Sequence, residues 1–243
     1  MILSEGVTIV TGGGAGIGAG ISRKLLADGA RVISIARRAP EFTHERLSFV
    51  KADLADRKET RDAAREIAAR ERILRIVHNS GVIRPAPVEE ATLEDLDYLA
   101  ELHLAAMLTL TQAALPAMKA AKFGRIVGVS SRGALGLQTR TNYSATKAGM
   151  IGMLRTWALE LGGYGITSNC VAPGPVESDM FHEIVPEGSE RKRKLADAIP
   201  VRRIGVPADV AHAVSFFLAP EAGFVTGQTL YVCGGTSIGS VVI

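Results

Sequence analysis

The chain has few cysteines, no long apolar run and little excess of charge. Its two cysteines, Cys170 and Cys233, have no C-x-x-C spacing and fall in expected buried strands. No apolar stretch approaches the ~18 residues of a membrane span, and a net charge of +3 is too small to indicate nucleic-acid binding. The first expected strand begins by Val7, which leaves no room for a secretory leader. We therefore expect a cytoplasmic protein in a reduced setting, without nucleic acid or membrane as partner.

The histidines show no metal-ligand spacing, so we expect no metal site. The basic run Arg191-Lys192-Arg193-Lys194 is most simply a solvated helix face.

Short apolar strands alternate with helical segments along the whole chain. Hydrophobic residues make up 47% of the sequence, enough for a large core, and no proline-rich or low-complexity linker interrupts the pattern. We expect one α/β domain over residues 1–243, with a doubly wound parallel sheet covered by helices on both faces. The expected strands span residues 7–10, 31–35, 47–50, 73–77, 125–129, 167–171 and 229–232.

A glycine-rich turn, Thr11-Gly12-Gly13-Gly14-Ala15-Gly16-Ile17-Gly18, follows the first expected strand and precedes a helical pattern. Glycines let the backbone turn tightly and approach a pyrophosphate, which then meets free N–H groups at the positive end of the helix. The turn alone is ambiguous, but it predicts a nucleotide site when a second chemical site accompanies it.

That second site is Tyr143 and Lys147, which lie four residues apart and so share a helix face. A nearby ammonium favours the phenolate, which makes Tyr143 a candidate proton donor or acceptor near neutral pH. Ligands of such sheets bind outside the carboxyl ends of the strands. That rule brings several segments to one rim: 12–18, Arg37, Asp53, Asn79, Ser131 and 173–178.

With these motifs in order, the sequence resembles the short-chain dehydrogenase/reductase family from Thr11 to Gly235. The family's T-G-x-x-x-G-I-G is Thr11 to Gly18, its Asp-Leu is Asp53-Leu54, its N-N-A-G appears as His78-Asn79-Ser80-Gly81, its Y-x-x-x-K is Tyr143 and Lys147, and its P-G segment is Pro173 to Ser178. The resemblance implies a Rossmann-type sheet with strand order 3-2-1-4-5-6-7. It also implies an enzyme that transfers a hydride between a nicotinamide and a ketone or secondary alcohol.

The resemblance assigns roles to particular residues. Ser131 would bind the substrate oxygen, Tyr143 would exchange its proton, and Lys147 would lower the pKa of Tyr143 and hold the nicotinamide ribose. The implied cofactor-binding residues are Thr11, Gly12, Gly14, Gly16, Ile17, Gly18, Arg37, Asp53, Leu54, Asn79, Gly81, Tyr143, Lys147, Pro173, Gly174, Val176 and Ser178.

The end of the second strand bears on the choice of cofactor. Ala36 stands where NAD-dependent members carry aspartate, and Arg37 can pair with a 2′-phosphate. Ala15 lacks the basic residue that some NADP-dependent relatives have in the glycine motif. We favour NADP(H), with NAD(H) as the alternative.

Two catalytic positions stay open at this point. Register from Gly124-Arg125 favours Ser131, although the spacing to Tyr143 in some relatives would select Ser130. His103 falls where relatives carry a relay asparagine, so it either replaces that residue or is structural. If it acts in the relay, we expect its titration near neutrality to appear in the pH–rate profile.

The substrate is not identified by the motifs. The expected pocket walls are residues 82–87, 132–141 and a lid at about 179–199. They include Arg84, Arg132 and Arg140, which bind an acidic substrate, bind the phosphopantetheine of a carrier protein, or face solvent. Reduction of a 3-oxoacyl thioester on a carrier protein is the alternative reaction, and a catalytically silent cofactor-binding regulator is a third hypothesis. Relatives commonly form tetramers, and the apolar segments 157–159 and 240–243 favour a homotetramer.

Overall fold

The computed structural model describes residues 5–178, 181–182 and 185–238. Within these ranges seven parallel strands form one sheet in the predicted order, β3-β2-β1-β4-β5-β6-β7. The strands are β1 (Val7–Thr11), β2 (Val32–Ala36), β3 (Leu47–Lys51), β4 (Ile73–His78), β5 (Gly124–Val129), β6 (Ile166–Pro173) and β7 (Thr229–Val232). The predicted fold class is confirmed.

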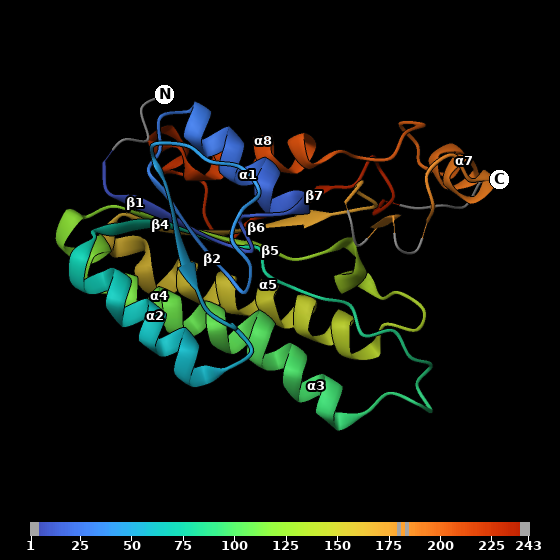
Figure 1. Ribbon diagram of the computed structural model, residues 1–243, viewed down its shortest axis with the longest axis horizontal. Coiled ribbons are helices and arrows are strands. Elements are labelled where there is room, and N and C mark those ends of the chain that lie inside the picture. Colours follow the sequence, from blue (N-terminus) through green and yellow to red (C-terminus); the bar gives the residue numbers. More distant parts are fainter. Residues whose placement is uncertain (1–4, 179–180, 183–184, 239–243) are drawn as a thin grey trace.

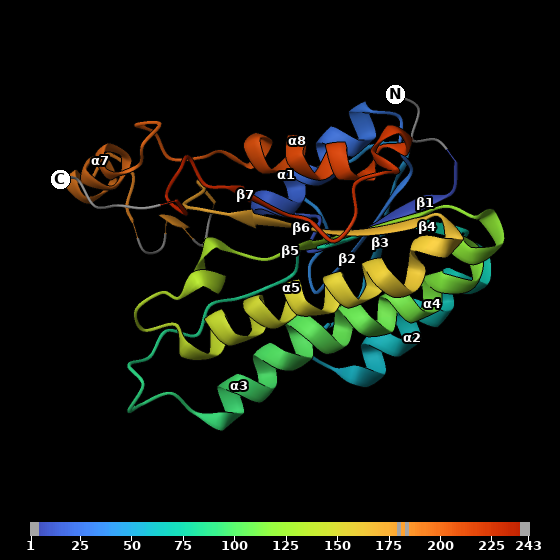
Figure 2. The same cartoon turned by 180° about the vertical axis from the view of Figure 1, so that it is seen from behind.

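Helices cover both faces of the sheet (Figures 1 and 2). On one face, α1 (Gly16–Ala27) packs against α8 (Pro207–Leu218). On the other face lie α2 (Arg57–Arg70), α4 (Ala106–Ala121) and α5 (Thr141–Leu161). Helix α7 (Glu190–Ala198) lies beyond the carboxyl ends of the strands, and α3 (Leu93–Ala100) runs into α4. Shorter turns are η2 (Arg132–Leu135), η3 (Gly162–Tyr164) and η4 (Pro220–Ala222).

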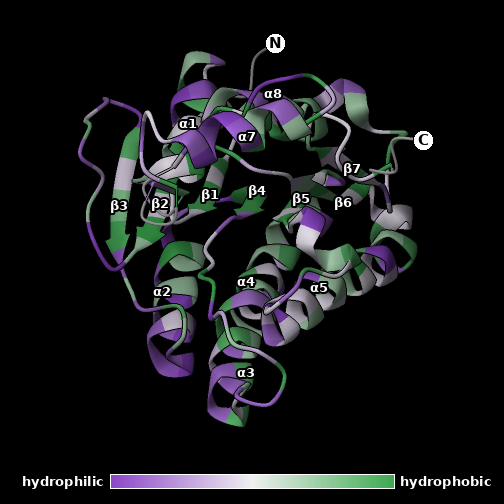
Figure 3. Ribbon diagram, turned by 90° about the vertical axis from the view of Figure 1, so that its right-hand side faces the viewer, coloured by the Kyte–Doolittle hydropathy of each residue, from purple (hydrophilic) through white to green (hydrophobic). Residues whose placement is uncertain are grey.

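The sheet separates two apolar layers because successive side chains of a strand point to opposite faces. Ile9 of β1 and Ile76 of β4 belong to the layer under α4 and α5, whereas their neighbours Val10 and Val77 belong to the layer under α1 and α8. All four side chains are fully buried. Figure 3 shows this arrangement as apolar strands between helices with hydrophilic outer surfaces.

Between α3 and α4 the helix passes through one π-helical turn, η1 (Glu101–Ala105). There the N–H of Ala106 donates to the carbonyl of Glu101, five residues back. The Leu102 carbonyl accepts a hydrogen bond from His78 Nε2 of β4 at 3.0 Å. His103 lies in this turn, near the carboxyl end of the sheet. Single π-helical turns are frequent at functional sites in proteins.

Three expectations change in detail. Cys233 does not lie in a strand: β7 ends at Val232, and Cys233 follows it, still buried. Trp157 and Ala158 are buried within the subunit, so only Leu159 of that segment faces outward. Residues 240–243, and positions 179, 180, 183 and 184 of the expected lid, lie outside the described residues. No helix in the described ranges combines the length and apolar character that crossing a membrane requires.

Candidate active site

The turn between β1 and α1 leaves the N-terminus of α1 open. Ala15 precedes the helix without a side-chain cap, and the first turn contains no acidic residue. The first N–H groups are therefore available to an anion, which the helix dipole also favours. A Cβ on Gly18 would come within 2.0 Å of the Gly12 carbonyl oxygen, so only glycine permits this close turn. Gly12 has a φ of +63°, which again favours glycine.

Ser178 lies next to the turn between β1 and α1. A Cβ on Gly16 would lie 3.3 Å from the Ser178 Cβ, although the two residues are distant in sequence. Pro173 ends β6, and Gly174 approaches Cys233 so closely that an added Cβ would lie 2.8 Å from the Cys233 Cα. The P-G segment and the glycine turn thus face the same space at the carboxyl edge of the sheet.

Arg37 follows β2 at the outer part of this rim. Its side chain is exposed, and in the described part of the chain nothing forms an ion pair or hydrogen bond with its guanidinium. Asp53 follows β3, and its Oδ1 accepts a hydrogen bond from the Ala55 N–H at 3.0 Å. Leu54 beside it is buried. These residues all follow the carboxyl ends of their strands, so they lie along the same edge of the sheet.

Thr11, the last residue of β1, connects this strand by hydrogen bonds to the end of β4 and the residues that follow it. Its Oγ1 accepts hydrogen bonds from the N–H groups of Asn79 and Ser80, both at 2.9 Å, and contacts His78 Nδ1 at 3.3 Å. Because His78 Nε2 donates to the Leu102 carbonyl, Nδ1 is left as an acceptor for the Thr11 hydroxyl. Asn79 is held next to Gly12, its amide donating to the Thr11 carbonyl at 3.1 Å.

Tyr143, Lys147 and Ser131 meet at the end of β5. The ammonium of Lys147 is 5.7 Å from the centre of the Tyr143 ring and donates to the Val129 carbonyl at 2.8 Å. Ser131 Oγ accepts from the Gly133 N–H at 2.9 Å, and a Cβ on Gly133 would lie 3.2 Å from both Ser131 Oγ and Tyr143 Cε1. Ser130 is different: it is buried, and its hydroxyl donates to the Lys147 carbonyl at 2.8 Å. The geometry therefore supports Ser131 as the reacting serine and gives Ser130 a role in holding Lys147.

The pKa of Tyr143 differs from the expectation. Burial raises this pKa above its ordinary value, while the hydrogen bond with Ser131 and the charge of Arg140 act in the opposite direction. Burial also lowers the pKa of Lys147 to about 8. Burial is the largest influence on the phenol, and the lowering of its pKa by Lys147 stays a prediction.

His103 is fully buried beside this pair. Its Nδ1 lies 2.9 Å from Thr146 Oγ1, whose own hydroxyl is directed to the carbonyls of Asn142 and Tyr143. The network thus assigns the proton to Nδ1, and Nε2 is an acceptor with no partner among the described residues. Its ring meets the Tyr143 ring edge-on at 5.8 Å.

The nitrogen Nε2 of His103 faces the same space as the lysine. A Cβ placed on Gly81 would lie 2.9 Å from this nitrogen and 3.3 Å from Lys147 Nζ. Burial, with the nearby charge of Lys147, lowers the pKa of His103 to about 2. The expectation that His103 titrates near neutrality is therefore wrong, since a fully buried imidazole beside a cation stays neutral.

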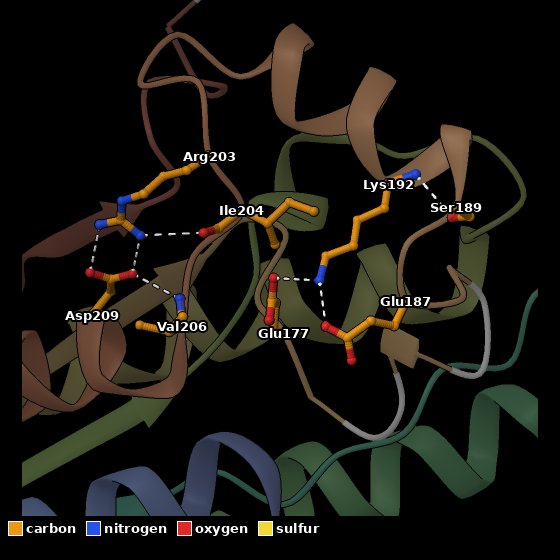
Figure 4. Close-up of polar contacts among 8 residues, drawn as sticks. All are labelled: Glu177, Glu187, Ser189, Lys192, Arg203, Ile204, Val206 and Asp209. Carbon is orange, nitrogen blue, oxygen red and sulfur yellow. Dashed lines mark hydrogen bonds and ion pairs between the residues drawn. The ribbon is translucent and has the colours of Figure 1, made fainter.

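The segment after the P-G motif is tied to α7 and α8 (Figure 4). Lys192 of α7 contacts Glu177 at 2.8 Å and Glu187 at 3.4 Å. Arg193 and Lys194 are exposed as expected, and Lys194 pairs with Glu190 at 3.0 Å. Arg203 makes a two-pronged ion pair with Asp209 of α8. Val176 between these anchors is buried. Within the described part of the expected lid, Lys192 therefore connects α7 to the segment that follows the P-G motif.

The three arginines of the expected pocket walls have different surroundings. Arg84 lies 3.7 Å from the Asp95 carboxylate and stacks over the Tyr98 ring. Arg132 follows Ser131 directly, and Arg140 precedes α5, where its charge acts on the Tyr143 phenol. The sequence gives Arg140 either as a residue that binds an acidic substrate or as one that faces solvent, and its effect on Tyr143 was not predicted. Thr146 was missed, because nothing in the sequence connects it with His103.

The described residues contain no cluster of three or more histidine, cysteine or acidic side chains arranged as metal ligands.

Comparison with known proteins agrees with this geometry. The family model described as enoyl-(acyl carrier protein) reductase matches residues 12–237. The chain is 34% identical to "(2S)-[(R)-hydroxy(phenyl)methyl]succinyl-CoA dehydrogenase subunit BbsD" of Thauera aromatica, over 98% of this chain and 99% of that protein. It is also 34% identical to a 3-oxoacyl-[acyl-carrier-protein] reductase of Thermotoga maritima, over 98% and 100%.

A solved structure, a putative NAD(P)-dependent gluconate 5-dehydrogenase from Beutenbergia cavernae with NADP bound at low occupancy, superposes with a TM-score of 0.87. It is 31% identical, over 96% of this chain and 97% of that one. The chain belongs to the short-chain dehydrogenase/reductase family. It is accordingly an oxidoreductase acting on CH–OH and C=O groups.

Proposed function

We propose that this protein is an NADP(H)-dependent oxidoreductase for a ketone and secondary alcohol pair. The observation that carries the proposal is the meeting of Ser131, Tyr143 and Lys147 at the carboxyl edge of the sheet, opposite an uncapped helix N-terminus. When bound, NADP(H) supplies or accepts the hydride. The chain's own residues position the carbonyl and move the proton.

Each of these residues has a task that its contacts support. Ser131 donates its hydroxyl hydrogen to the substrate oxygen, while its Oγ accepts a hydrogen bond from the Gly133 N–H. Tyr143 gives its proton to the developing alkoxide during reduction and takes it back during oxidation. Lys147 stabilises the phenolate that results, and His103 Nε2 accepts a hydrogen bond in the chain that restores the proton.

The cofactor contacts follow the rim. We propose that the N–H groups of Gly16, Ile17 and Gly18 bind the pyrophosphate, because α1 has no cap of its own. Arg37 binds the adenosine 2′-phosphate, which favours NADP(H) over NAD(H); the NADP held by the relative from B. cavernae supports this choice. The remaining proposed contacts are those of Thr11, Gly12, Gly14, Asp53, Leu54, Asn79, Gly81, Pro173, Gly174, Val176 and Ser178.

Reduction of a 3-oxoacyl thioester is the second candidate, favoured by the likeness to the reductase of T. maritima. Oxidation of NADPH, followed at 25 °C with a panel of ketones, oxo acids and acyl thioesters, tests both. Turnover of thioesters far above that of free ketones would select the second candidate. NADPH binding without turnover of any member would instead support a silent regulator and contradict the proposal.

We further infer a homotetramer of single-domain subunits in the cytoplasm. Phe224, Ile238 and Leu159 are large apolar side chains with relative exposures of 103%, 89% and 87%, and β7 is an edge strand. The two free cysteines fit a reduced compartment. A monomeric mass by light scattering at micromolar concentration would contradict the tetramer.

A further inference from the structure

Arg140 carries a positive charge at a position where the local electrostatics disfavour a cation. It precedes α5, where the helix dipole is positive, and the first turn of α5 offers neither an acidic residue nor a side-chain cap. No carboxylate in the described ranges pairs with its guanidinium, and its Nε is buried without a partner. A sequence that keeps an unpaired charge at such a place commonly does so for a function.

The backbone next to Arg140 is itself strained. Thr139 has a φ of +60°, a conformation that a β-branched residue rarely adopts. In this conformation the carbonyl and hydroxyl of Thr139 both accept hydrogen bonds from Arg140 Nη1, at 3.1 and 2.5 Å. The same carbonyl accepts from the Ala86 N–H at 3.0 Å. Thr139 therefore fixes the guanidinium between two walls of the expected pocket.

The backbone places Arg140 close to Tyr143. Arg140 pairs with Ala86 in a short parallel bridge and directly precedes α5, which carries Tyr143 in its first turn. Its charge also acts to lower the pKa of the Tyr143 phenol, against the larger effect of burial. Arg84 differs, because Asp95 neutralises it and the ring of Tyr98 covers it.

We propose that Arg140 is a specificity-determining residue that binds a carboxylate of the substrate, so that the preferred substrates are short oxo acids and hydroxy acids. This inference rests on the proposed function and names its substrate class. A carboxylate within a few bonds of the reacting carbon would pair with the planar guanidinium and lie near the positive end of α5. The phosphates of a coenzyme A thioester are remote from the reacting carbon and do not meet this requirement.

The first experiment compares acetoacetate with its methyl ester, which has a similar carbon skeleton but no charge. In the native protein kcat/KM for the acid should exceed that for the ester by on the order of tenfold or more. In Arg140→Met the ratio should fall to about one, mainly through KM, while ester reduction persists. Arg140→Lys should restore part of the ratio, and Arg84→Met, the matched control, should leave it unchanged.

The second experiment does not depend on turnover. In the presence of NADPH, calorimetry should show tighter binding of isovalerate, which replaces the ketone oxygen of acetoacetate by a methyl group, than of neutral isovaleramide. That difference should vanish in Arg140→Met and persist in Arg84→Met. Equal binding of the two probes by the native protein, or a difference that survives in Arg140→Met, overturns the assignment.

The outcomes separate the two proposals. Reduction of neutral ketones without a preference for acids would refute the role of Arg140 and leave the oxidoreductase function standing. Carboxylate binding without reduction of any carbonyl would support the role of Arg140 and refute the proposed reaction. A third readout is the pH–rate profile for oxidation of a neutral alcohol. It should shift to higher pH in Arg140→Met, because loss of the charge raises the pKa of Tyr143.

Discussion

At the scale of single residues, Tyr143 provides a direct test because its ring packs and its hydroxyl reacts. Tyr143→Phe keeps the ring contact with His103 but removes the proton donor, so kcat should fall by about 10²–10⁴-fold or more. Binding of NADPH, measured by fluorescence, should be nearly unchanged. Tyr164→Phe, on the exposed turn η3, is the control. Near-native activity of Tyr143→Phe would refute the assignment.

Lys147 is expected to behave differently from Tyr143. Its ammonium serves both the phenolate and the proposed ribose contact, and it is held by the Val129 carbonyl. Lys147→Ala should therefore lower kcat and also raise Kd for NADPH. A variant that lost turnover while binding NADPH normally would separate these two tasks and contradict the ribose contact.

Arg37 carries the cofactor preference. Because its guanidinium has no partner in the described chain, it can give a charge-assisted hydrogen bond to a 2′-phosphate, worth about 1.5–3 kcal/mol or roughly 10–100-fold in Kd. Kd should be lower for NADPH than for NADH, and Arg37→Ala should narrow the gap. Arg31→Ala serves as control, since Arg31 pairs with Glu71 at 2.6 Å. An unchanged gap in Arg37→Ala would count against this role.

At the scale of elements, the π-turn η1 determines how His103 acts. His103→Asn keeps a side chain that accepts hydrogen bonds, so catalysis should be preserved. His103→Leu should lower kcat about 10–100-fold with little change in Kd for NADPH. Since His103 is neutral at working pH, neither variant should change the shape of the pH–rate profile near neutrality. Equal activity of the leucine and native proteins would make His103 structural.

The elements also show what a sequence can predict. All seven strands follow from short runs rich in apolar residues, because parallel strands are buried on both faces; even β6, which also buries Thr167, Ser168 and Asn169, keeps enough apolar residues to be located. The rim residues follow from the rule that ligands bind at carboxyl ends of strands. The π-turn was not predictable, since Leu102-His103-Leu104 fits a regular helix equally well. Its position depends on the contact between His78 and Leu102, which are distant in sequence.

The burial of two histidines affects the stability of the whole molecule. The pKa of His78 is lowered to about 3 and that of His103 to about 2, both mainly by burial. Below the ordinary histidine pKa of ~6.5 the unfolded chain takes up protons that the folded chain does not, so stability falls as pH falls towards about 3. Each histidine should cost about 2 kcal/mol at about pH 5 relative to pH 7.

Urea unfolding of the native protein and of His78→Asn between about pH 7 and 5 measures this cost. Between about pH 7 and 5 the free energy of unfolding of His78→Asn should fall by about 2 kcal/mol less than that of the native protein, because one buried histidine has been removed. His44→Asn is the control, because His44 is exposed. Parallel pH dependence of the native protein and His78→Asn would mean that His78 takes up a proton in the folded state.

Thr139 also has a consequence for attempts to make the protein more heat-resistant. Its backbone conformation stores strain on the order of 1 kcal/mol, and Thr139→Gly would relieve it. The same replacement removes the hydroxyl that holds Arg140. Directed evolution that rewards survival at high temperature alone would accept the glycine wherever the strain relieved exceeds the gain in entropy of the unfolded chain. The selected enzyme would be more heat-resistant but would discriminate less well between oxo acids and neutral ketones.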